Sequence, residues 1–230
     1  MGGFMKNTRL MGVAVLLMAL PCFASESERD RVRCFLKDAA AANAPIEIAS
    51  EHNDTHILLS LPQGWQDGKC SGAVVRDKFI FGAFIEVLKQ RKVVDLDLSH
   101  SHLEVTPFFA DLTDLQKLTV SGCPWMGEAL CRYSAGLRRY PRRYASYKFL
   151  PPSVKCLDMS SCNISCLSAH ALPKDLHYLD IRYNRKLGLS GIEGEWPTVG
   201  LSVNAYGTQI GCRLPEGIVH LEGENVIKQV

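Results

Sequence analysis

Apolar residues recur at a fixed spacing through the second half of this chain. Four segments carry an apolar residue followed, three and five positions later, by two more with polar residues between them: VVDLDLSHSHL from 93, LQKLTVSGCPW from 115, VKCLDMSSCNI from 154 and LHYLDIRYNRKL from 176. Alternation of this kind is typical of a strand with one buried face. Each segment therefore predicts a short strand. Two degenerate copies follow, in TVGLSVNAYGTQI and GIVHLEGENVI.

The apolar pairs of the four strands are expected to fill one shared core: Leu96 and Leu98, Leu118 and Val120, Leu157 and Met159, and Leu179 and Ile181. Where the chain leaves the second, third and fourth strands, it carries Cys123, Cys162 and Asn184. An Asn side chain there can bond the backbone of the neighbouring turn, and a buried Cys can replace it. Because one repeat cannot bury its own apolar face, the copies are expected to stack.

These segments match the leucine-rich repeat pattern L-x-x-L-x-L-x-x-N/C-x-L. The stretches LPPSVKCL, LPKDLHYL and LPEGIVHL resemble the L-P-x-x-L-x-x-L form of bacterial leucine-rich repeat proteins, including effectors of pathogens, over about residues 93–227. The resemblance implies an α/β leucine-rich repeat solenoid, with short parallel strands on its concave face and an irregular or helical convex side. It also implies a bacterial origin and an effector-like role in host interaction. The repeats are fewer and less regular than in many effectors.

Residues 25–92 precede the repeats and predict an N-terminal α/β cap, which leaves 93–230 to the repeats. ESERDRVRCFLKDAAAAN is rich in alanine and predicts a helix, and THILLSLPQGW predicts a strand. RDKFIFGAFIEVLKQR predicts a second helix, because Phe81, Phe84, Ile85 and Leu88 recur at helical spacing. We expect this region to cover the open end of the repeat core.

The first 24 residues have the pattern of a secretory signal peptide. A basic start, MGGFMKNTR, is followed by the apolar run LMGVAVLLMAL and a small-residue exit. The run is short for a membrane span, and no other segment of the chain resembles one. We therefore expect cleavage after Ala24 and an exported protein, secreted or periplasmic, without a transmembrane segment after cleavage.

Charge is balanced over the chain but not along it. The net charge is +2, and loss of Lys6 and Arg9 with the signal peptide would leave equal numbers of acidic and basic residues, which predicts no affinity for nucleic acid. Basic residues gather in LRRYPRRYASYKF, 137–149, inside an insertion at about 126–150 that makes one repeat oversized. Arginine and tyrosine are enriched in interfaces. The candidate binding residues of this insertion are Arg138, Arg139, Tyr140, Arg142, Arg143, Tyr144 and Tyr147. The alternative is a solvated loop whose tyrosines pack on the repeats.

The outward positions of the strands form a second candidate surface. One predicted column contains Asp97, Thr119, Asp158, Asp180, Ser202 and Glu222, and a second contains Asp95, Lys117, Cys156, Tyr178, Gly200 and His220. His177, Arg182 and Tyr183 lie near the fourth repeat. An acidic face with aromatic side chains suits a basic or mixed protein partner. The alternative is an ordinary solvated sheet face. The predicted contact residues are Asp97, Lys117, Asp158, His177, Tyr178, Asp180, Arg182, Tyr183 and Glu222.

Eight cysteines follow residue 24, which permits disulfides in an exported chain. Cys34 and Cys70, both in the cap, are a candidate bridge, whereas Cys123 and Cys162 are expected to be buried and reduced. Cys156, Cys162, Cys166 and His170 have a spacing unlike that of usual zinc fingers. We expect no metal and no cofactor.

No common nucleotide-binding or hydrolase motif occurs in the sequence. The sequence therefore predicts an exported protein that binds a protein partner without chemistry of its own. The first alternative is an envelope-associated structural protein that binds anionic lipid or polysaccharide through the basic insertion. The second is a hydrolase, because catalytic triads assemble in space and leave no spacing signature.

Overall fold

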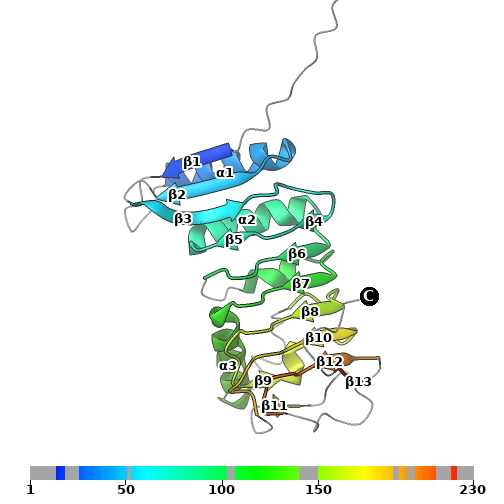
Figure 1. The fold of residues 1–230 in the computed structure, drawn as a ribbon. Helices are drawn as coiled ribbons and strands as arrows, with labels where there is room; N and C mark the ends of the chain where they lie inside the picture. The colour runs from blue at the N-terminus through cyan, green and yellow to red at the C-terminus, as the bar shows by residue number, and fades with distance from the viewer. Residues whose placement is uncertain are drawn as a thin grey trace, which may run out of the picture.

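A computed structural model describes residues 14–18, 26–50, 53–102, 107–139, 150–188, 192–194, 196, 200–210 and 219–221. Within these residues the fold is mixed α/β, with three α-helices and a seven-stranded sheet whose neighbouring strands are all parallel. A four-stranded sheet lies at the N-terminal end, and a two-stranded sheet lies near the other end (Figure 1).

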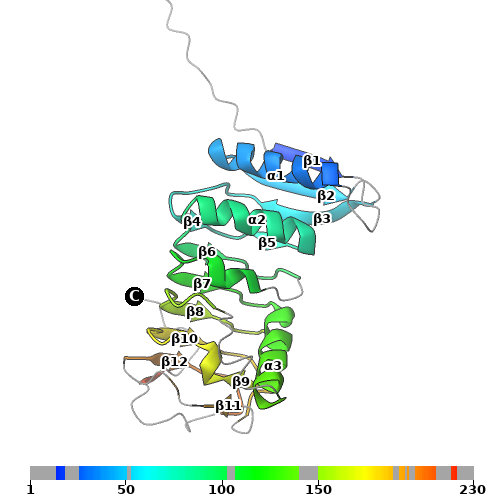
Figure 2. The ribbon, with the colours of Figure 1, turned by 180° about the vertical axis from the view of Figure 1, so that it is seen from behind.

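The N-terminal region combines two helices with the four-stranded sheet. Helices α1 (Glu26–Ala41) and α2 (Lys78–Gln90) lie on the same side of the molecule, as the view from behind shows (Figure 2). The sheet has the order β1-β2-β3-β5, with β1 at Ala14–Met18, β2 at Ile46–Ser50, β3 at Asn53–Leu61 and β5 at Val74–Val75. The two predicted helices and the predicted strand of the cap are therefore present.

Helix α2 begins where its sequence allows a cap. The side chain of Asp77 accepts a hydrogen bond from the backbone N–H of Ile80 at 2.8 Å, which satisfies a donor of the first turn. The predicted apolar stripe of Phe81, Phe84, Ile85 and Leu88 is confirmed, because each of these side chains is at most 1% exposed.

Strand β1 lies inside the predicted signal peptide. It pairs in parallel with β2 along five residues, from Ala14 beside Ile46 to Met18 beside Ser50. In the full chain this apolar segment therefore occupies an edge of β2. Cleavage after Ala24 stays a prediction.

The seven-stranded sheet follows the repeats in chain order, apart from its first strand, which the cap contributes. The order is β13-β12-β10-β8-β7-β6-β4. The strands are β4 (Lys69–Cys70), β6 (Asp95–Asp97), β7 (Lys117–Thr119), β8 (Cys156–Asp158), β10 (Tyr178–Asp180), β12 (Ser202–Asn204) and β13 (Val219–Leu221). A strand therefore lies in each predicted copy, and the eight residues predicted to fill the core from the first four strands are all 0% exposed.

Side chains in the turns after the strands form hydrogen bonds with the backbone of the adjoining repeat, as the sequence predicts. The Asn184 amide oxygen accepts from the backbone N–H of Cys162 at 3.0 Å and of Ile164 at 2.9 Å, and its nitrogen donates to the carbonyl of Met159 at 2.9 Å. The Cys162 thiol donates to the Val120 carbonyl at 3.0 Å. Buried polar groups of the turns thus find partners in the adjoining repeat.

The third residue after each of five repeat strands has a left-handed backbone, with φ between 57° and 71°: His100, Gly122, Ser161, Tyr183 and Gly207. The side chains explain where glycine is needed. A Cβ on Gly122 would lie 2.5 Å from Nδ1 of His100, and one on Gly207 would lie 3.0 Å from the Tyr183 ring. A ring in one turn therefore packs over a glycine in the next.

Helix α3 (Pro124–Arg139) lies in the long connection between β7 and β8, at the start of the predicted insertion. The same part of the fold contains the two-stranded sheet of β9 (Leu167–Ser168) and β11 (Ile192–Glu193). Two short 3-10 helices lie at Pro107–Asp111 and Ala169–Ala171.

The candidate bridge between Cys34 and Cys70 is wrong for this structure, in which both are free cysteines. Cys34 is exposed on α1, whereas Cys70 is 0% exposed in β4 beside Leu96. Cys70 therefore belongs to the sheet core, and burial raises the pKa of its thiol to about 12. Cys123 and Cys162 are buried thiols, as predicted.

Candidate functional site

The last residues of five repeat strands form a row, which we call the strand-end row: Asp97, Thr119, Asp158, Asp180 and Asn204. The register of the last two strands differs from the predicted columns. Ser202 lies beside Tyr178, and Asn204 lies beside Asp180, because Leu201, Val203 and Ala205 are the residues that point into the core.

The sixth strand shifts in the same way. Val219 lies beside Ser202, and Leu221 lies beside Asn204, so that His220 is not in the predicted column. The predicted contact residue Glu222 lies outside the described residues.

The acids of the strand-end row serve the turns that follow them. The Asp97 carboxylate accepts from the backbone N–H and the hydroxyl of Ser99, at 2.9 and 2.6 Å. Asp158 accepts in the same way from Ser160, at 3.0 and 2.7 Å. An Asp that bonds the backbone two residues on is an Asx turn, so these acids have a structural role that repeats along the row.

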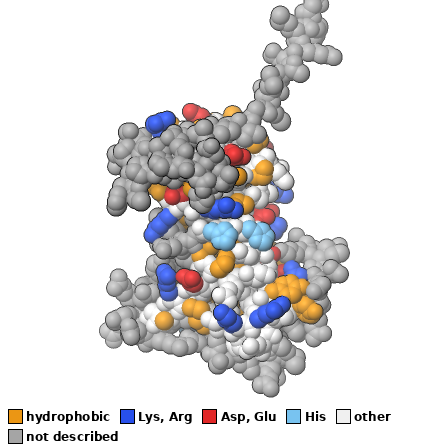
Figure 3. Space-filling model, turned by 60° about the vertical axis from the view of Figure 1, so that its left-hand side comes forward, with side chains coloured by type: hydrophobic (Ala, Val, Ile, Leu, Met, Phe, Trp, Pro, Cys, Tyr) orange, Lys and Arg blue, Asp and Glu red, His pale blue; other side chains and the backbone are white. Residues whose placement is uncertain are grey.

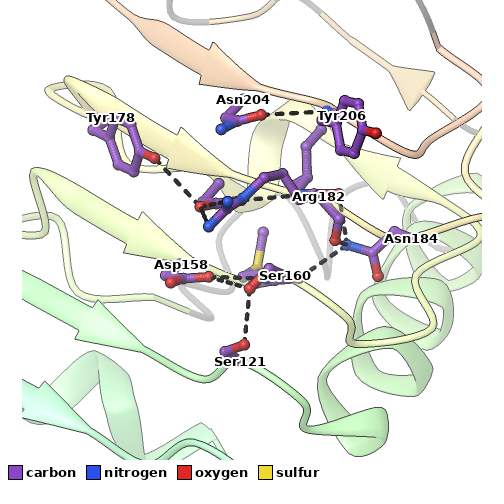
Figure 4. Close-up of polar contacts among 11 residues, drawn as sticks. Ser121, Asp158, Ser160, Tyr178, Arg182, Asn184, Asn204 and Tyr206 are labelled. Carbon is purple, nitrogen blue, oxygen red and sulfur yellow. Dashed lines mark hydrogen bonds and ion pairs between the residues drawn. The ribbon is translucent and has the colours of Figure 1, made fainter. Parts of the chain in front are cut away.

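Asp180 is fully buried and is neutralised by Arg182 (Figure 4). Nε of Arg182 lies 3.0 Å from both carboxylate oxygens, and a second guanidinium nitrogen lies 2.9 Å from Oδ2. The hydroxyl of Tyr178 donates to the same carboxylate at 3.3 Å. Hydrogen bonding to Asp180 raises the pKa of Arg182, and burial and the negative charge of Asp180 raise the pKa of Tyr178 to about 12.

Burial therefore reassigns several predicted contact residues. Asp158, Tyr178 and Asp180 are at most 7% exposed and belong to the turn network, not to an open surface. Lys117 is half-buried and forms an ion pair with Asp95 at 3.2 Å. His177 is exposed beside β10.

Two exposed aromatic side chains, Tyr183 and Tyr206, lie on adjacent turns at the end of the row, and we call them the tyrosine pair. They are 37% and 45% exposed, and their ring centroids are 5.7 Å apart in an edge-to-face arrangement at 87°. Tyr183 was among the predicted contact residues, but Tyr206 was not. The alternation of Val203 and Ala205, which are both buried, fixes the register of this repeat and could have indicated that Tyr206 is exposed.

Figure 3 shows that one face of the described protein carries acidic and basic side chains interspersed with hydrophobic ones and with histidines. No single sign of charge dominates this view. A mixed surface of this kind favours recognition by shape and individual pairs over attraction by a uniform field.

The serines near the row do not have the arrangement of an activated nucleophile. Ser160 bonds Asp158 directly and lies 2.8 Å from the Ser121 hydroxyl, with no imidazole between serine and carboxylate. Within the described part of the chain, no group of three or more His, Cys, Asp or Glu side chains could hold a metal ion.

Most of the basic segment 137–149 lies outside the described residues. Arg138 and Arg139 are the last two residues of α3, while Tyr140, Arg142, Arg143, Tyr144 and Tyr147 are not described. None of the described helices is both long enough and apolar enough to cross a membrane. Comparison with known proteins found no matching family model, no similar curated protein and no similar solved structure.

Proposed function

We propose that this chain is an exported leucine-rich repeat protein, a solenoid that binds a protein partner with the edge formed by the strand-end row and the tyrosine pair. The parallel strands in chain order and the side chains that bond neighbouring turns support the repeat assignment. Repeat proteins of this architecture present extended binding surfaces. The binding role is therefore supported by analogy with that fold.

The tyrosine pair is the observation that carries the proposal. Tyrosine is among the residues that dominate binding energy at protein interfaces. Here two rings are exposed together, and the Tyr183 ring is held in place by the close approach of Gly207. A ring held in this way loses little conformational entropy on binding.

The charges beside the pair indicate the chemistry of the partner. Asp158 and Asp180 are buried and bonded within the turn network, so the partly exposed carboxylates of the two outward columns are Asp95 and Asp97. The cations are Lys117 and Arg182, counted with its turn. Lys117 already pairs with Asp95, and Arg182 already pairs with Asp180. Asp97 is partly exposed and, among the described residues, lies outside both of these ion pairs, so the row suits a peptide segment that carries a basic side chain as well as an apolar or aromatic one.

The described pockets fit surface recognition better than enclosure of a small molecule. A pocket of about 120 Å³ lies between Leu88 and Asp111, and another of about 160 Å³ lies between Leu150 and His170. Small-molecule sites usually occupy roughly 300 Å³ or more.

The test is a selection of peptides from a random library on the immobilised full chain. We expect selected peptides to share a basic residue beside an apolar one, and the joint change Tyr183→Ala and Tyr206→Ala to weaken their binding at least about 30-fold by calorimetry. Lys37→Ala, at an exposed position of α1 outside the proposed edge, is the matched control and should leave affinity unchanged. Circular dichroism should show that both variants fold.

Two results would count against this proposal. In the first, the selected peptides bind the tyrosine variant as tightly as the unchanged chain. In the second, the selection fails and the chain binds vesicles of anionic phospholipid at low salt, with binding lost when Arg138, Arg139, Arg142 and Arg143 become Ser. That second result would transfer the function to the basic insertion, because such binding is electrostatic.

A further inference from the structure

Helix α3 rests directly on the turn of the third repeat. A Cβ on Gly127 would lie 2.5 Å from the carbonyl oxygen of Cys162 and 2.9 Å from the carbonyl carbon of Asn163, so the helix backbone touches the turn backbone. Met126 and Leu130, on either side of Gly127 in the helix, are both 0% exposed. The position of this helix relative to the turn is therefore set by close packing.

Cys131 lies one helical turn after Gly127 and so shares its face of α3. The turn beneath continues from Asn163 to Ser165 and Cys166. The sulfur of Cys131 lies 3.1 Å from the hydroxyl of Ser165, the residue that precedes Cys166, and the Cys166 side chain is among the groups that act on the Cys131 thiol. Two thiols from distant parts of the chain are therefore close neighbours.

We propose that Cys131 and Cys166 are a disulfide site, and that the bond between them fastens helix α3 to the turn before β9. Because α3 already packs on this turn and Cys131 already contacts Ser165, next to Cys166, the bond requires a local approach of the two sulfurs and no movement of the helix. Both residues are half-buried, so a small oxidant can reach them. The inference stands apart from the proposed binding function, since it uses no residue of the strand-end row or of the tyrosine pair.

The two cysteines also differ chemically from the core cysteines. Burial opposes ionisation of Cys131, but hydrogen bonds with Cys166 and Ser165 outweigh it and lower the pKa of the Cys131 thiol. Burial raises the pKa of Cys123 to about 11 and that of Cys162 to about 12. Since the thiolate is the reactive form, Cys131 is the favoured attacking group.

The oxidant is a disulfide, either a small molecule or a protein. The Cys131 thiolate attacks one sulfur of the oxidant, breaks its S–S bond and forms a mixed disulfide, releasing one thiolate. The Cys166 thiolate then attacks the sulfur of Cys131, and the second thiolate leaves. The two cysteines lose two electrons and two protons in total, and the oxidant becomes two thiols.

The experiment uses the full chain, purified with reductant and then equilibrated with oxidised glutathione. Remaining thiols are blocked, and the peptides are mapped by mass spectrometry before and after reduction. We expect a cross-link between the peptides of Cys131 and Cys166, and a mass lower by two hydrogens. Closing the intervening loop should raise the melting temperature by roughly 10 °C, an increase that reductant reverses.

Cys131→Ser and Cys166→Ser should each abolish both the cross-link and the melting shift. Cys34→Ser, which removes an exposed thiol from α1, is the matched control and should keep both. A stable glutathione adduct on Cys131 without a cross-link would overturn the proposal, as would a cross-link to a different cysteine. Peptide mapping of the unchanged chain tests the disulfide even if a variant fails to fold. It also requires no binding partner.

Discussion

At the scale of single residues, the molecule depends on side chains that satisfy the backbone of a neighbouring repeat. Asn184 is the fullest case, because it is fully buried and uses both its oxygen and its nitrogen. An unsatisfied buried backbone group costs about 1–3 kcal/mol. Asn184 therefore contributes more to stability than its exposed neighbours do.

Asn184→Ala is expected to lower the free energy of unfolding by about 3–5 kcal/mol, because it leaves the N–H groups of Cys162 and Ile164 without their partner. Urea denaturation measures the loss. Asn163→Gly is a matched control: Asn163 is exposed and has φ of 55°, which glycine adopts readily, so stability should change by less than about 0.5 kcal/mol. Equal losses in the two variants would contradict this role for Asn184.

The sequence predicts whether a residue is buried only where the spacing of apolar residues decides it. Leu96 and its counterparts were predictable because their spacing alone separates inside from outside. Asp180 was not, because an acid at an outward strand position predicts exposure, and its burial depends on Arg182 folding back over it. Tyr206 was missed because the fifth repeat is degenerate, and only its buried residues fix its register.

At the scale of elements, helix α3 is positioned by one glycine. Glycine within a helix normally lowers stability relative to alanine by about 0.5–1 kcal/mol. At Gly127 the contact with the Cys162 carbonyl reverses the comparison, since a methyl group there would displace the helix. At this position, replacement of glycine by alanine is thus favoured by helix propensity and opposed by packing.

Gly127→Ala is expected to destabilise the protein by about 1–3 kcal/mol through overpacking. Gly82→Ala is the matched control in α2, where nothing lies within 4 Å of the added Cβ, and it should be stabilising by about 0.5–1 kcal/mol. Thermal denaturation of the two variants decides the sign of each effect. If Gly127→Ala also stabilises the protein, α3 does not rest on the turn as described.

Elements with strong periodicity could be predicted from sequence, and short ones could not. The stripe of α2 and the alternation in β6, β7, β8 and β10 each have a spacing that indicates the element. Strands β4, β5, β9 and β11 have only two residues each, and their pairing is decided by distant neighbours. Tertiary contacts, not local preference, define such strands.

At the scale of the whole molecule, three buried thiols and one buried tyrosine hydroxyl make the stability of the fold depend on pH. Burial raises the pKa of Cys70 and Cys162 to about 12, that of Cys123 to about 11 and that of Tyr178 to about 12. Each folded pKa lies above the unfolded value. These groups therefore contribute stability that is complete below about pH 9 and is lost as the pH rises through 9–12.

The melting temperature, measured with reductant present, is therefore expected to stay level to about pH 9 and to fall steeply above it. Each buried thiol should contribute on the order of 1 kcal/mol to the loss at pH 10. Cys70→Ala should lose less stability than the unchanged chain between pH 8 and pH 10, while Cys34→Ser should follow the unchanged chain. A melting temperature that stays constant to pH 11 would show that these thiols ionise without unfolding.

The long connection between β7 and β8 has a consequence for how the chain tolerates changes in its length. These strands begin at 117 and 156, whereas β8 and β10 begin at 156 and 178, yet both pairs keep the same register. The entropy of closing a loop grows only with the logarithm of its length, so the longer connection costs about 0.5 kcal/mol more than an ordinary repeat. Insertions and deletions after α3 should therefore accumulate among descendants of this sequence while the sheet stays intact.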